Sequence, residues 1–141
     1  MKTLADAFEH TLKDMYYAEN ALLKAIPVTA AAATNKDLKQ SLKEHLAETK
    51  AQVETLKKVF KSIGKKPAGE KCDAIEGLIK ECEGVIEEGE AAPARDAAII
   101  GCCQAIEHYE IARSGTLGGS AKAPGRGRGH DKLDQILDQE K

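Results

Sequence analysis

The sequence predicts an all-α protein with one domain over residues 1–141, and three observations lead to this fold class. Apolar residues recur at three- and four-residue steps along most of the chain, which is the spacing of a helix face. Apolar residues make up 42% of the chain and charged residues 31%, with no Trp and four Pro, a composition typical of helical proteins. A chain of 141 residues has room for one hydrophobic core.

The first predicted helix covers residues 3 to about 33. Thr3 is its expected N-cap, with Asp6 three positions later in an arrangement like a capping box. Pro27 is expected to kink this helix rather than end it, because the alanines that follow have high helix propensity. One face of the helix carries Leu4, Phe8, Thr11, Met15, Glu19, Leu22 and Ile26.

A second helix is predicted after Thr34 and Asn35, whose side-chain oxygens are suited to N-capping, and it ends at Gly64. At about 1.5 Å per residue this helix is about 40 Å long, which is a length typical of helix bundles. Its face carries Leu38, Leu42, His45, Thr49, Gln52, Leu56, Val59 and Ile63.

Two further helices are predicted beyond a linker at residues 65–71. The third covers residues 72 to about 88 and is weakened by Gly77 and Gly84. The fourth covers residues 94 to about 113. Its predicted face carries Ala97, Ile100, Gln104, Glu107 and Ile111.

The composition changes abruptly at residues 114–129, which read SGTLGGSAKAPGRGRG. Such a segment buries too little apolar surface to offset the entropy of ordering it, so we expect it to be flexible. Residues 130–141 return to a helical pattern, although so short a helix is marginal unless it docks. The GRGRG run, with Arg126 and Arg128, is short and lacks the aromatic residues of a segment that binds nucleic acid.

Charge and cysteine content narrow the classes of partner. The 21 basic and 23 acidic residues give a net charge of -2, which provides no field for nucleic acid or an anionic membrane. With neither a signal peptide nor a membrane-spanning stretch in view, we expect a cytoplasmic protein that binds neither of them. Cys72, Cys82, Cys102 and Cys103 lack a CxxC spacing and are expected to be small buried apolar side chains, with zinc binding and redox sensing as alternatives.

Polar residues interrupt the predicted apolar faces. Glu19 follows Met15 by four residues and precedes Leu22 by three, so a carboxylate stands where a core side chain belongs. Burying such a charge alone costs on the order of several kcal/mol. Comparable positions on or beside the faces of the later helices are held by His45, Glu48, Gln52, Glu107, Glu110 and Glu140.

Inward carboxylates on several helices repel one another unless they share protons or a cation. Hard oxygen and imidazole ligands suit iron and manganese, which carboxylates bridge inside helix bundles. For any single helix, the plainer interpretation is a Glu at the edge of the face with its carboxylate in water. His45 fits direct ligation and a hydrogen-bonded core role equally well. Tyr16, Tyr17 and Tyr109 either pack as ordinary core residues or hydrogen-bond to a ligand carboxylate.

Four stretches cover most of residues 3–117: MYYAENALLKAIPVTAAAATN, LKEHLAETKAQVETLKKVF, KCDAIEGLIKE and RDAAIIGCCQAIEHYEIARSGTL. They resemble the bacterial YciE/YciF-type ferritin-like family, which is associated with stress responses. The resemblance implies a ferritin-like antiparallel four-helix bundle with an extra inserted helix, a homodimer, and a di-iron site similar to that of rubrerythrins. The implied metal ligands are Glu19, Glu48 with His45 or Gln52, Glu107 with Glu110, and Glu140.

The chain departs from the family's pattern after SGTL, where the family continues with an Ala- and Leu-rich helix and extends its last helix beyond the position of Lys141. Two functions follow. One is an oxidoreductase or iron-handling protein whose di-iron or di-manganese site reacts with dioxygen or peroxide. The other is a non-catalytic helical dimer that acts through protein contacts, with a degenerate metal site.

Overall fold

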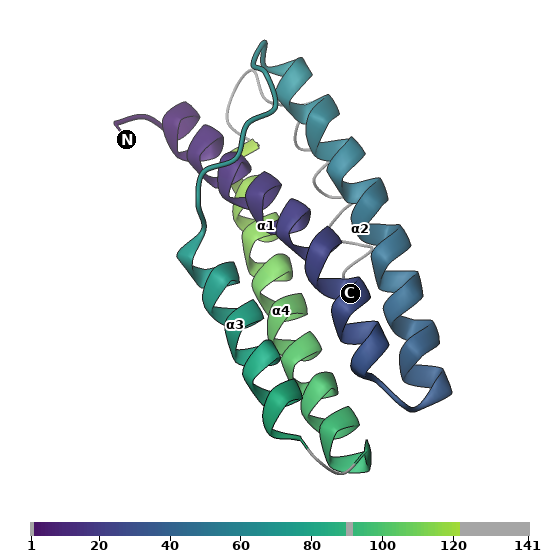
Figure 1. Cartoon of the computed structure of the whole chain (residues 1–141). Helices are drawn as coiled ribbons and strands as arrows, with labels where there is room; N and C mark the ends of the chain where they lie inside the picture. Colours follow the sequence, from purple (N-terminus) through teal and green to yellow (C-terminus); the bar gives the residue numbers. More distant parts are fainter. Residues whose placement is uncertain (1, 90–91, 122–141) are drawn as a thin grey trace.

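The computed structural model describes residues 2–89 and 92–121, which form four helices: α1 (Leu4–Ala32), α2 (Lys36–Ser62), α3 (Asp73–Glu88) and α4 (Ala92–Ala121). Consecutive helices run antiparallel (Figure 1). No strand occurs among the described residues, and the predicted all-α fold class is confirmed. None of the described helices is both long and apolar enough to cross a membrane.

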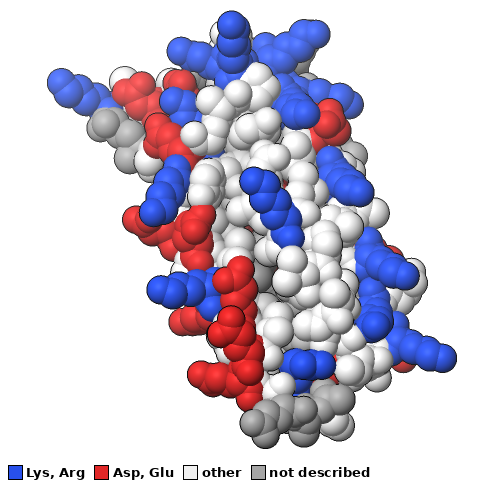
Figure 2. Space-filling view, viewed as in Figure 1, with Lys and Arg blue, Asp and Glu red and all other residues white. Residues whose placement is uncertain are grey.

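Helix α1 is central to the arrangement. It packs against α2, α3 and α4, whereas α3 packs against α1 and α4. In Figure 1, α2 lies on one side of α1, and α3 and α4 lie on the other. Figure 2 shows acidic side chains gathered over α3 and basic side chains along α2, with few charges on the face between them. Because α1 packs against all three other helices, it joins α2 to the pair formed by α3 and α4.

Side-chain caps start the first two helices where the sequence predicts. Thr3 Oγ1 accepts a hydrogen bond from the Asp6 amide at 3.0 Å. Asn35 Oδ1 accepts from the amides of Asp37 and Leu38 at 2.9 and 3.1 Å. Each cap satisfies amides that have no partner within the first turn of a helix. Pro27 lies within α1, which continues to Ala32 as predicted.

Helix α4 is longer than predicted, since it continues beyond Arg113 to Ala121. Glycine in a helix costs about 1 kcal/mol relative to Ala, which is why the sequence favours an end near Arg113. Ser114 is fully buried, however, and its hydroxyl lies 3.8 Å from the Met15 sulfur on α1. Packing against α1 thus holds the helix past the point where intrinsic propensity falls. The rest of the predicted flexible segment and the short last helix lie outside the described residues.

The predicted inner face of α4 was wrong by about one residue. Ile100, placed on that face, is 45% exposed, and Gln104 is also exposed. The buried face instead carries Asp96, Ile99, Ile106, Glu110 and Ser114. The stretch around Ile100 is apolar on every side, so periodicity alone did not fix which face is buried. Packing against α1 and α3 makes that choice.

The apolar core falls into two clusters. The α1–α2 cluster consists of Phe8, Leu12, Met15, Leu56, Val59 and Phe60. The four-helix cluster draws on all four helices and consists of Ala18, Leu22, Ile26, Ala33, Leu42, Cys72, Ile75, Ile99 and Ile106. The boundary between the clusters on α1 falls between Met15 and Ala18, next to Glu19.

Asp96 joins the start of α4 to the turn between α1 and α2. Its Oδ1 accepts from the Thr34 amide at 2.9 Å, and its Oδ2 accepts from the Thr34 hydroxyl at 2.7 Å and the Asn35 amide at 2.8 Å. The hydrogen bond from the Thr34 side chain, followed by those from the two amides, holds the pKa of Asp96 below its ordinary value. This carboxylate is therefore ionised in the folded protein at neutral pH.

Replacing Asp96 with Asn is expected to destabilise the fold at neutral pH, because one acceptor oxygen becomes an amide group that faces donors. Because the pKa of Asp96 is lower in the folded than in the unfolded protein, its carboxylate stabilises the fold above about pH 4, which is near the pKa of an Asp in the unfolded chain. This stabilisation is lost as the pH falls through the pKa of Asp96 in the folded protein. The urea midpoints of wild type and variant should therefore differ at pH 7 and converge below about pH 4. Asp37→Asn, at an exposed site in the first turn of α2, is the control and should change the midpoint less. An equal difference at every pH would contradict this account.

Two glycines should respond oppositely to substitution by Ala. A Cβ at Gly64 or at Gly77 would meet no atom within 4 Å, but Gly64 has a φ of +71° and Gly77 lies inside α3. Gly64→Ala should destabilise the protein by about 1 kcal/mol because the left-handed conformation disfavours a Cβ. Gly77→Ala should stabilise it by about 0.5–1 kcal/mol through helix propensity. Urea unfolding measures both, and shifts of the same sign would refute the argument.

Candidate metal centre

Four polar side chains interrupt the apolar inner faces of α1, α2 and α4, and we call this set the buried polar layer: Glu19, His45, Gln52 and Glu110. Glu19 and Gln52 are 0% exposed and Glu110 is 1% exposed. On α1, Glu19 separates Met15 of the α1–α2 cluster from Leu22 of the four-helix cluster. The layer therefore interrupts a continuous apolar interior, as the sequence predicts for Glu19 and Gln52.

The layer contains one close contact between an acid and a base. His45 Nε2 on α2 lies 3.5 Å from Glu110 Oε1 on α4, and the two side chains are 11% and 1% exposed. Both oxygens of Glu110 are buried, and neither accepts a hydrogen bond from a described residue. A carboxylate in such surroundings is strongly stabilised by a nearby cation, either an imidazolium or a metal ion.

The remaining predicted ligands are not part of the buried polar layer. Glu107 is half-buried and lines a surface hollow of about 190 Å³ together with His45. Glu48 is exposed on α2, so the described structure does not bring it into the layer. Glu140 lies outside the described residues. The structure thus buries one acid of α1, one acid of α4 and Gln52 of α2, and it brings His45 of α2 within 3.5 Å of the α4 acid Glu110. The second α4 acid, Glu107, shares a hollow with His45.

The donor set fits iron or manganese in its chemistry. Two carboxylates, an imidazole and an amide oxygen are hard or borderline ligands of the kind these metals prefer. The two buried oxygens of Glu110, without hydrogen bonds from described residues, are suited to receive a cation. Within the described part of the chain, no group of three His, Cys, Asp or Glu side chains is close enough to hold a metal ion.

Two tyrosine hydroxyls bond to groups outside the predicted ligand set. Tyr109 OH lies 2.8 Å from Cys72 Sγ and accepts from Arg113 Nε at 3.2 Å. Burial, with a smaller contribution from Cys72, raises the pKa of Tyr109 to about 12. Tyr17 donates to Glu76 on α3. These bonds favour the packing interpretation for both residues. The pairing of Tyr109 with Cys72 was missed, since no local pattern relates positions so far apart.

The four cysteines are free thiols, and two of them have strongly raised pKa values. Burial raises the pKa of Cys82 to about 12 and that of Cys103 to about 11, and like-charge repulsion from neighbouring groups adds to both shifts. Because the thiolate is the form that binds metals and attacks electrophiles, both thiols are weak ligands and weak nucleophiles at neutral pH. The predicted burial holds for Cys72 and Cys82, whereas Cys102 and Cys103 are only partly buried.

Comparisons with known proteins extend this description. A model of the DUF892 family, a domain of unknown function, matches residues 3–141. The chain belongs to the DUF892 family. Protein YciF of Escherichia coli (strain K12) is 42% identical over 142 residues, which cover 100% of this chain and 86% of YciF.

Two solved structures resemble this DUF892 chain closely. YcfI from Rhodopseudomonas palustris matches with a TM-score of 0.96 and 45% identity, over 99% of this chain and 88% of YcfI. The Escherichia coli stress protein YciF matches with a TM-score of 0.94 and 42% identity, over 99% of this chain and 89% of that one. The predicted YciF-type resemblance is confirmed.

The raised thiol pKa values predict slow alkylation in the folded protein. Iodoacetamide at pH 8 should modify Cys103 at least about tenfold more slowly in the native protein than in urea, because the thiolate fraction falls tenfold per pKa unit. Cys82 should be slower still. Mass spectrometry of peptides from a time course gives both rates, with the urea-unfolded protein as the control. Rapid native modification of Cys103 would contradict the assigned burial.

Proposed function

We propose that this DUF892 protein is a stress-associated cytoplasmic protein that holds two iron or manganese ions at the buried polar layer. The burial of Glu19 and Glu110 inside an otherwise apolar bundle is the observation that carries the proposal. Two ionised carboxylates in such a place destabilise the fold unless cations offset them. When bound, the metal ions would supply redox chemistry toward dioxygen or peroxide.

The proposed ligands are divided by their place in the bundle. Glu19 of α1 and Glu110 of α4 provide carboxylates, and His45 of α2 provides Nε2, the ring atom that faces Glu110. Gln52 contributes an amide oxygen or orients a neighbouring carboxylate. Glu107, half-buried at the hollow that it shares with His45, provides a further carboxylate at the surface side of His45. Glu48, which is exposed, and Glu140, which lies outside the described residues, are ligands implied by the sequence resemblance and are not part of the proposed set.

The proton on His45 connects metal uptake to pH. Only an imidazole nitrogen without a proton binds a metal, so uptake through Nε2 requires that this atom be deprotonated. An imidazolium at His45 would instead pair with Glu110 Oε1, 3.5 Å away. Metal and proton therefore compete for the same position between α2 and α4. The apolar clusters on both sides limit the access of water to the position between His45 and Glu110.

Metal binding should stabilise the wild-type protein and fail in variants of the layer. Manganese(II), which avoids oxidation during the measurement, should add about 2.7 kcal/mol at 100 times its Kd. Glu19→Gln and Glu110→Gln should lose this gain and bind less metal by elemental analysis. Glu54→Gln is the control, because Glu54 is exposed on α2 and its carboxylate forms a surface ion pair with Lys57 at 3.1 Å.

Glu48→Gln and Glu107→Ala distinguish ligands from neighbours in the same assay. Loss of metal in Glu107→Ala with retention in Glu48→Gln is expected from their different burial. If the wild-type protein takes up neither iron nor manganese, or if Glu19→Gln and Glu110→Gln both bind metal as the wild type does, the proposed centre is wrong. The non-catalytic helical protein is then the better description.

A further inference from the structure

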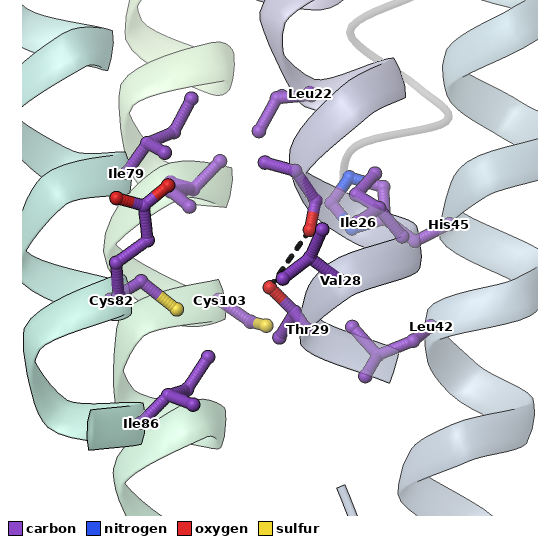
Figure 3. A pocket seen from close by; sticks show the side chains of 13 residues that line it. Leu22, Ile26, Val28, Thr29, Leu42, His45, Ile79, Cys82, Ile86 and Cys103 are labelled. Carbon is purple, nitrogen blue, oxygen red and sulfur yellow. Dashed lines mark hydrogen bonds between the residues drawn. The ribbon is translucent and has the colours of Figure 1, made fainter. Parts of the chain in front are cut away.

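A small cavity lies between the four helices, and its lining includes the exposed residues Val28 and Glu83 (Figure 3). Its volume is about 30 Å³. Most of its lining is apolar and includes Leu22 and Ile26 of α1, Leu42 of α2, Ile79 of α3 and Ile106 of α4. The Cys82 and Cys103 side chains also face this space in Figure 3.

The cavity adjoins the buried polar layer on three helices. His45 lines the cavity and also lies 3.5 Å from Glu110. Leu22 follows Glu19 by three residues, and Ile106 precedes Glu110 by four, so each wall residue shares a helix face with a carboxylate. These spacings correspond to about 4.5 and 6 Å along a helix axis. A molecule in the cavity is therefore within about one helical turn of the layer.

The lining gives a water molecule little to bind. A buried water usually makes two to four hydrogen bonds. The Thr29 hydroxyl, which faces the cavity, already donates to the Ala25 carbonyl at 3.0 Å. The thiols of Cys82 and Cys103 are weak hydrogen-bonding groups. His45 is engaged with Glu110, and Glu83, the one carboxylate of the lining, is exposed.

The volume limits the size of an occupant. A cavity needs about 10–15 Å³ on this measure to hold one water-sized sphere, so 30 Å³ has room for about two. A diatomic molecule fits this space. An apolar diatomic also gives up few hydrogen bonds on leaving water, whereas hydrogen peroxide would leave its donors and acceptors unsatisfied.

We propose that this cavity is a binding site for dioxygen that delivers it to the buried polar layer in preference to hydrogen peroxide. The delivery step rests on the proposed metal centre, but binding of the gas is a property of the metal-free chain. Dioxygen enters the cavity between the apolar side chains of the four helices and binds beside His45. The site thus selects between the two oxidants by polarity.

Xenon tests the cavity without any metal. Crystals of the metal-free protein under xenon pressure should show one xenon atom between Leu22, Leu42 and Ile106. Cys103→Leu fills the cavity and should abolish that site, whereas Cys103→Ala enlarges it and should retain the site. Both variants remove the same thiol, so a chemical role of sulfur cannot explain a difference between them. Absence of xenon from the wild-type cavity, or equal occupancy in Cys103→Leu, would overturn the proposal.

The metal-loaded protein tests delivery. In the reaction measured, one dioxygen molecule takes two electrons from two ferrous ions and two protons from solvent, and it leaves as hydrogen peroxide. Cys103→Leu should slow the initial oxidation by dioxygen about tenfold or more relative to Cys103→Ala, with manganese binding unchanged in both. Oxidation by added hydrogen peroxide should change less than twofold. An equal loss with both oxidants would refute the selection of dioxygen.

Failure of the two proposals gives different results. A protein that binds xenon in the cavity but takes up no iron or manganese retains the gas site and loses the proposed metal centre. A protein that binds metal but no xenon loses the gas site alone. If Cys103→Leu does not fold, as judged by circular dichroism, Leu42→Phe replaces it as the variant that fills the same cavity from α2.

Discussion

The burial of two carboxylates, Glu19 and Glu110, constrains how the rest of the bundle is built. An ionised carboxylate moved from water to a protein interior costs on the order of several kcal/mol unless it is paired, and two in one bundle also repel each other. The apolar clusters on either side provide the burial that offsets this cost in the folded chain. His45 provides a positive partner when it is protonated, and a neutral ligand when it is not. The position of α2 relative to α4 therefore matters for function, because it sets the distance between His45 and Glu110. Most of the packing between helices, by contrast, involves α1.

The sequence was sufficient for most of the helices because several kinds of local evidence agreed. Thr3 and Asn35 marked helix starts by capping chemistry, and the face of α2 was correct from Leu42 to Val59 because polar residues separate its apolar positions clearly. Glu19 was identified for the same reason, since apolar neighbours on both sides of it leave one interpretation of the face. Local patterning thus predicted the helices and placed three members of the buried polar layer, Glu19, His45 and Gln52, on the correct faces.

Helix α4 shows where local patterning stops. Apolar residues surround Ile100 on every side, so the sequence did not distinguish its exposed face from the face that packs on α1. Because of this error, the sequence placed Glu107 on the buried face. In the structure Glu110 is buried and Glu107 is only half-buried. Ser114 extends the helix through a contact with Met15, which lies on α1 far away in the sequence. Neither feature follows from propensity, because each depends on which helix packs alongside.

The polar layer and the apolar cavity impose opposite demands on the same helices, and the sequence meets them by separating the two along the helix axis. A cation needs donors that remain charged, whereas an apolar gas needs walls that bind no water. On α1 the change from Glu19 to Leu22 occurs within one turn, and on α4 the change from Glu110 to Ile106 does the same. His45 belongs to both regions, with Nε2 near the carboxylate and the ring at the cavity wall. A shift of α2 by one residue would turn its buried face by about 100° and carry His45 away from both Glu110 and the cavity wall, so the packing of α2 against α1 governs the carboxylates and the cavity together.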